Sequence, residues 1–105
     1  MIRKILSTVI LVIVTTSIFA QQLTQTIRGT ITDNASSIVI PYAGIQIQNT
    51  NSGVLSDTLG NFSLKNIPVG RYNIEVTMMG YEPVILKEIQ VTSGKEVFLN
   101  IQMKE

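Results

Sequence analysis

The sequence of 105 residues contains no histidine, no cysteine and no tryptophan. Without histidine and cysteine there is no Ser-His-Asp or Cys-His nucleophile pair, and no metal site built on those side chains. The missing cysteines also exclude disulfides and a lipid anchor attached to a cysteine. Charged residues make up only 14% of the chain and hydrophobic residues 45%, which is not the composition of a disordered polar chain. We therefore expect one small folded domain.

The first twenty residues have the three parts of a secretory signal peptide. Arg3 and Lys4 form a basic start, an uncharged apolar run begins at Ile5, and Ala20 supplies the small residue at a cleavage site. The alternative is an uncleaved membrane anchor, but the run is shorter than the roughly 20 residues of a spanning helix and is diluted by Ser and Thr. The sequence predicts a helical signal peptide over residues 1–20, no membrane span after its cleavage, and an exported domain over residues 24–105.

The basic residues are unevenly placed, and this changes the meaning of the net charge. The whole chain carries a formal charge of +1. Removal of Arg3 and Lys4 with the signal peptide leaves six basic against seven acidic residues. The mature domain is therefore slightly acidic, and nucleic acid or an anionic membrane surface is not an expected partner.

Apolar residues recur with a period of two along the rest of the chain, which is typical of strands with one buried face. Clusters of Asn, Asp, Ser, Gly and Pro separate the runs at short intervals and predict turns. No window supports an amphipathic helix, so the sequence predicts an all-β sandwich or small barrel. The alternating apolar positions are Ile27, Gly29, Ile31; Ala43, Ile45, Ile47; Phe62, Leu64; Tyr72, Ile74, Val76, Met78; and Val97, Leu99, Ile101, Met103.

The stretch of residues 84–91 does not keep one parity. Val84 and Leu86 fall on one side of an ideal strand, whereas Ile89 and Val91 fall on the other together with Ile85. A β-bulge would bring the two sets to one core face. A strand covered on both faces is the alternative, and the sequence leaves both open.

In this order and spacing, the turns and strands resemble the carboxypeptidase regulatory-like domain over about residues 26–104. The resemblance implies a seven-stranded Greek-key β-sandwich of the transthyretin-like (prealbumin-like) type. The matching residues are Gly29, Ile31 and Asp33 in an opening G-x-(V/I)-x-D, then Pro41, Ala43, Ile45 and Ile47, then Gly53, then Asp57, Gly60 and Phe62, then Ile67, Pro68, Gly70 and Tyr72, and finally Gly80 and Tyr81.

The resemblance also suggests a setting, because in many relatives this domain begins a TonB-dependent outer-membrane receptor. We expect a non-catalytic, exported envelope module with a structural or interaction role, linked to such receptor systems. It would act in the periplasm, at the outer membrane or outside the cell, without cofactor or metal. Envelope or receptor proteins are the expected partners, and a glycan is possible. Two alternatives remain: a carbohydrate- or peptide-binding module, and the N-terminal fragment of a truncated receptor.

Two acidic patterns are better explained by structure than by chemistry. The segment of residues 57–61 has only part of a calcium loop, since Leu59 occupies a ligand position. We expect a turn in which the Asp57 carboxylate accepts backbone N–H groups and Gly60 is left-handed. Glu82, Glu88 and Glu96 are expected on the solvated surface, because a small sandwich has little room for a catalytic cleft.

The aromatic side chains supply the candidate contact residues. Tyr72 lies on the apolar parity, so we expect it in the core, with its hydroxyl bonded back to the preceding loop. Tyr42 and Tyr81 are candidates for ligand contact near the ends of the sandwich. Phe98 lies on the polar parity of the last predicted strand and marks a possible partner surface. If that strand is an edge, its free backbone groups would allow β-augmentation.

Overall fold

The computed structural model describes residues 23–105, and the signal peptide predicted for residues 1–20 lies outside this range. The described part contains no helix, and therefore none that could cross a membrane. Its seven strands are β1 (Thr24–Asp33), β2 (Gly44–Ile47), β3 (Gly53–Leu55), β4 (Asn61–Pro68), β5 (Gly70–Thr77), β6 (Val84–Val91) and β7 (Val97–Met103).

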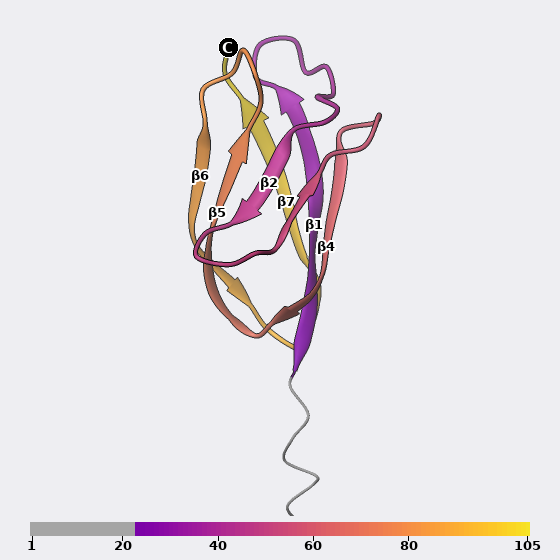
Figure 1. The fold of residues 1–105 in the computed structure, drawn as a ribbon. Helices are drawn as coiled ribbons and strands as arrows, with labels where there is room; N and C mark the ends of the chain where they lie inside the picture. The colour runs from indigo at the N-terminus through magenta and orange to yellow at the C-terminus, as the bar shows by residue number, and fades with distance from the viewer. Residues whose placement is uncertain (1–22) are drawn as a thin grey trace, which may run out of the picture.

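The strands form two sheets that face each other (Figure 1). One sheet has the order β4-β1-β7 and the other has the order β3-β2-β5-β6. β1 and β7 run parallel, with Ile27 beside Val97 and Asp33 beside Met103, whereas every other pairing is antiparallel. The prediction of an all-β, seven-stranded sandwich is confirmed.

The core lies between the sheets and is built from the alternating positions of the sequence. Because successive strand residues point to opposite faces, each strand supplies every second side chain to the interior. Isoleucine dominates, and its branched side chain suits a pleated surface. The buried hydrophobic residues are Ile27, Ile31, Ile40, Ala43, Ile45, Ile47, Phe62, Leu64, Ile67, Ile74, Val76, Val91, Ile101 and Met103.

A β-bulge explains the mixed parity of residues 84–91. The register between β5 and β6 shifts between Tyr72 and Ile74, and Glu88 on the facing strand has a φ of 57°. Across this irregularity the half-buried side chains change parity, from Val84 and Leu86 to Ile89, which is followed by the buried Val91. The bulge alternative is therefore right, although Ile85 stays outside the core, 46% exposed.

The left-handed backbone at Glu88 gives a testable prediction. A side chain in this region costs roughly 1–2 kcal/mol, which glycine avoids at a smaller cost in chain entropy. The surface ion pair of Glu88 with Arg71, at 3.9 Å, adds little to stability. We expect Glu88→Gly to raise the free energy of unfolding by about 0.5 kcal/mol in urea denaturation. Lys87→Gly, one residue earlier, should lower it, so equal effects of the two variants would contradict this account.

Two predicted turns have the expected hydrogen bonds. One Asp57 carboxylate oxygen accepts the N–H groups of Leu59 and Asn61, each at 2.9 Å, and Gly60 has a φ of 76°. The Tyr72 hydroxyl donates to the Pro68 carbonyl at 2.6 Å, across the tight link from β4 to β5. The structural interpretation of both motifs is confirmed. Both depend on hydrogen bonds between residues no more than four apart.

Candidate functional site

Exposed apolar side chains gather at one end of the sandwich. This distal end holds the C-terminus and lies opposite Thr24, where β1 begins (Figure 1). It carries six of the ten large hydrophobic residues that are exposed in the described part of the chain. These six are Ile38, Val39, Tyr42, Leu55, Leu59 and Met79.

Two of the predicted contact residues meet in an open hollow of about 600 Å³ at this distal end. Tyr42 and Tyr81, which are far apart in sequence, line it together. Tyr42 is 60% exposed and Met79, on the same hollow, is 93% exposed. The remaining lining residues are Gly44, Leu55, Thr77, Met78 and Pro83.

Tyr42 is held in place by a buried serine. Ser56, only 2% exposed, donates its hydroxyl to the Ile40 carbonyl and accepts the Ala43 N–H, both at 2.8 Å. The Ser56 carbonyl also accepts the Tyr42 N–H at 3.0 Å. These bonds fix the turn in which Tyr42 has a φ of 62°. Sequence reasoning missed Ser56, since a serine after a three-residue strand gives no sign of burial.

Tyr81 is held by the last residue of β1. Its hydroxyl donates to one Asp33 carboxylate oxygen at 2.8 Å, and the other oxygen accepts the N–H groups of Ala35 at 2.8 Å and Ser36 at 3.0 Å. The Ser36 N–H, then Tyr81 and the Ala35 N–H, hold the pKa of Asp33 below its usual 3.8. The bond to the Asp33 carboxylate raises the pKa of Tyr81 to about 12. Tyr81 therefore offers its ring to the hollow and uses its hydroxyl for structure.

The Tyr81–Asp33 bond predicts an alkaline limb in the stability profile. The pKa of Tyr81 is about 12 in the folded protein against an ordinary 10.0. The stability that the Tyr81–Asp33 bond contributes is therefore complete below pH 10.0 and is lost as the pH rises through about 12. We expect Tyr81→Phe to have a lower Tm than the wild type at neutral pH. The difference in Tm between the two proteins should become smaller as the pH approaches 12. A gap that stays constant with pH would contradict this, and Tyr42→Phe, at an exposed tyrosine, is the control.

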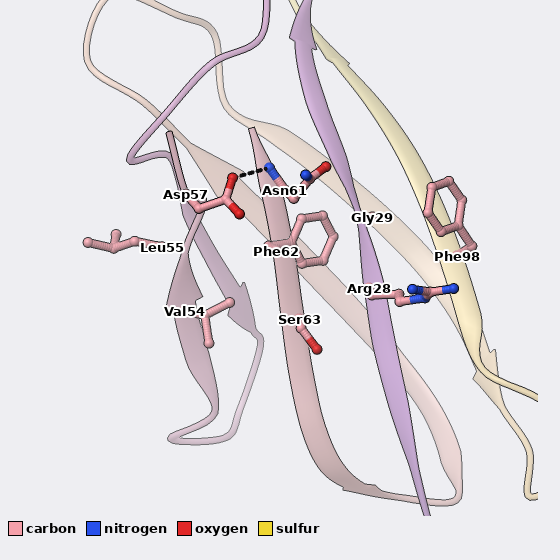
Figure 2. Close-up of a pocket in the computed structure, with 9 residues that line it drawn as sticks. All are labelled: Arg28, Gly29, Val54, Leu55, Asp57, Asn61, Phe62, Ser63 and Phe98. Carbon is pink, nitrogen blue, oxygen red and sulfur yellow. Dashed lines mark hydrogen bonds between the residues drawn. The ribbon is translucent and has the colours of Figure 1, made fainter. Parts of the chain in front are cut away.

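Phe98 lies on a different surface. Its ring is 61% exposed on β7, and the Arg28 guanidinium sits 5.9 Å from the ring centroid. Arg28 also forms an ion pair with Glu96 at 2.8 Å. Figure 2 shows Arg28 and Phe98 on one side of a second hollow, of about 560 Å³, with Val54 and Leu55 on the other. The structure thus divides the three aromatic candidates between two surfaces.

The arrangement of these groups suits binding. Within residues 23–105, no three acidic side chains come together in a group that could hold a metal ion. Glu82, Glu88 and Glu96 are all exposed, and the last two face arginines. The distal end instead offers tyrosine rings, flexible methionine side chains and an apolar rim, which are the groups that contact a partner or a ring-shaped ligand.

Comparison with known proteins gives a family and a fold. Residues 26–104 match the family described as carboxypeptidase regulatory-like domain. No curated protein matches the chain. Among solved structures, a type II cohesin–X-dockerin complex from Acetivibrio cellulolyticus has a TM-score of 0.66 at 22% identity, covering 75% of this chain and 56% of that one.

Two further solved structures have the same fold. The major pilin subunit of Bacillus cereus gives a TM-score of 0.62 at 20% identity, covering 78% of this chain and 30% of that one. A putative carbohydrate binding protein from Bacteroides uniformis gives 0.59 at 13% identity, covering 75% and 40%. The chain thus spans about half, or less, of the length of these proteins, and at such identities the likeness shows the fold alone.

Proposed function

The chain belongs to the carboxypeptidase regulatory-like domain family, and we propose that it is an exported, non-catalytic interaction module of the bacterial cell envelope. Its partner surface would be the distal end, and its partner an envelope protein of the TonB-dependent receptor systems. The predicted signal peptide over residues 1–20 supports export. The family resemblance supports the receptor setting, since the same domain begins many such receptors.

The concentration of exposed apolar residues at the distal end carries this proposal. Single exposed hydrophobic side chains are normal on a soluble domain, whereas a contiguous group marks a contact surface. Of the six residues here, Tyr42, Leu55 and Met79 line one hollow, and the unbranched side chain of Met79 adapts to the shape of a partner. Tyr42 adds a rigid ring with a polar tip, a residue type enriched at interfaces. The same fold also occurs in a cohesin–X-dockerin complex and in a pilin subunit.

Site-specific photo-crosslinking in the native envelope tests this proposal. A photoreactive residue at position 79 should yield a crosslink to a TonB-dependent receptor. The same residue at position 69 is the matched control, because Val69 is also exposed and apolar but lies in the link between β4 and β5, at the opposite end of the sandwich. Equal crosslinking from both positions, or none from position 79, would overturn the proposal.

A second candidate function is carbohydrate binding by the same hollow. The observation that favours it is the meeting of Tyr42 and Tyr81, because two tyrosine rings on one hollow can pack against sugar rings. Titration with a broad glycan panel, followed by tyrosine fluorescence and by amide NMR shifts, tests it. A response that disappears in Tyr42→Ala would support glycan binding, and no response across the panel would eliminate it.

A further inference from the structure

The edge strands of the two sheets differ in how they are protected. Each sheet has two edges, formed by β4 and β7 in one and by β3 and β6 in the other. β3 has only three residues, β4 contains Lys65 and Pro68, and β6 contains Lys87 beside the bulge at Glu88. Short length, charge, proline and bulges all hinder pairing with another strand. Three of the four edges therefore resist added strands.

β7 has none of these protections. Its seven residues include no charge, no proline and no glycine, and no strand within residues 23–105 pairs with its outer edge. The Met103 carbonyl accepts the Asn34 N–H at 2.9 Å on the β1 side. Because neighbouring residues of a strand direct their backbone groups to opposite edges, Phe98, Asn100 and Gln102 point theirs to the free edge. β7 is thus an open template for a further strand.

The free edge of β7 is closed by a hydrogen bond at its C-terminal end, and a charged residue flanks it at each end. The Lys104 carbonyl accepts the Glu82 N–H at 2.7 Å, which closes the edge just beyond β7. Glu96 precedes the strand and Lys104 follows it, and both share the outer face with Phe98, Asn100 and Gln102. The open stretch is therefore uncharged in its middle, with an acid at one end and a base at the other.

We propose that β7 pairs antiparallel with β7 of a second copy of this chain, with Asn100 opposite Asn100 of that copy. In this register Glu96 of each copy faces Lys104 of the other, and Phe98 faces Gln102 of the other. A shift by one residue in the facing strand would align backbone groups that point away from each other. A shift by two would preserve backbone pairing but would separate the opposite charges. Charge complementarity therefore selects both the second copy and the register.

The pairing would join two three-stranded sheets into one across a two-fold axis. It would satisfy the free backbone groups of Phe98, Asn100 and Gln102, and cover part of the Phe98 ring, which is now 61% exposed. This edge runs along β7 and reaches the distal end only at Lys104. Protection of the Phe98 and Asn100 amides therefore reports on the pairing without involving Tyr42 or Met79, and it is distinguishable from the crosslinking test of the proposed function.

The test uses the exported protein purified from the periplasm of an expression host. Sedimentation velocity over a range up to millimolar concentration should show the apparent mass doubling. Over the same range, amide hydrogen exchange at Phe98, Asn100 and Gln102 should slow by about tenfold or more. A protein that stays monomeric, or that dimerises without protecting these amides, would overturn the proposal.

Charge reversal provides the specific variants. Lys104→Glu sets two carboxylates against each other at both ends of the paired strands and should weaken self-association by about tenfold or more. Adding Glu96→Lys to it restores opposite charges between the copies but also removes the Arg28–Glu96 ion pair, so it should recover part of the loss. Lys87→Glu, on the β6 edge, is the matched control and should change nothing. Failure of the double variant to recover association would refute the register.

A proline at the centre of the edge gives a second, independent variant. Asn100 directs its N–H away from β1, so Asn100→Pro removes a donor that the monomer does not use. The variant should keep the Tm of the monomer and lose the doubling of mass. A fully dimeric Asn100→Pro protein would show that another surface holds the copies together. Binding of an extended peptide to a strictly monomeric wild type would likewise overturn the assignment to a second copy.

Discussion

Gly29→Ala is expected to lower the free energy of unfolding by about 3 kcal/mol or more. A Cβ at Gly29 would lie 1.9 Å from the Leu99 carbonyl oxygen and 3.0 Å from the Phe62 ring. The first obstacle is backbone, which cannot rotate away as a side chain can. Gly29 is paired with Leu99 in the middle of the parallel β1–β7 register, so relief would require separating the two strands. That separation would break the three-stranded sheet.

Urea denaturation followed by circular dichroism measures this effect. Gly94→Ala is the matched control, because a Cβ there would meet nothing within 4 Å. We expect the control to change the free energy of unfolding by less than about 0.5 kcal/mol. Since a domain of this size has only about 5–10 kcal/mol of stability, the Gly29 variant should be largely unfolded at modest urea concentrations. Similar midpoints for the two variants would contradict the close approach of β1 and β7.

The features that local contacts determine could be predicted from the sequence. The period-two pattern places Ile27, Ile31 and their equivalents in the core because a strand alternates its faces whatever its partners. The Asp57 turn and the Tyr72–Pro68 bond join residues no more than four apart. The same reasoning identified Tyr42, Tyr81 and Phe98 as candidates for contact, and their roles in binding stay predictions.

The features that long-range contacts determine could not be predicted. The meeting of Tyr42 and Tyr81 depends on the pairing of Gly44 with Thr77, which brings the β2 and β5 ends together. The bond from Tyr81 to Asp33 spans 48 residues. The position of β7 at an edge depends on which strands pair, and alternation is the same in a central strand and in an edge strand. Gly29 matched the family pattern, but the physical reason for a glycine at this position is its pairing with Leu99, 70 residues later in the sequence.

Ser56→Ala is expected to lower the free energy of unfolding by about 2–4 kcal/mol, although it removes only one oxygen atom. The Ser56 hydroxyl accepts the Ala43 N–H and donates to the Ile40 carbonyl, both at 2.8 Å, in a site that is 2% exposed. Its loss leaves one buried donor and one buried acceptor without these bonds, and each carries its own desolvation cost. Thermal unfolding should show a Tm lower by about 10 °C or more.

Ser63→Ala is the control for this variant, because Ser63 is exposed on β4 and its loss should shift Tm only slightly. The consequence of Ser56→Ala extends to the distal end, since Ser56 fixes the turn that carries Tyr42. At a temperature where the variant is still folded, the amide shifts of Tyr42 and Ala43 should move while those around Phe98 should not. Unchanged Tyr42 shifts with a normal Tm would mean that the turn is held by its backbone bonds alone. Moved Tyr42 shifts together with a lowered Tm would show that the conformation of the Tyr42 turn and the stability of the fold depend on the same buried hydroxyl.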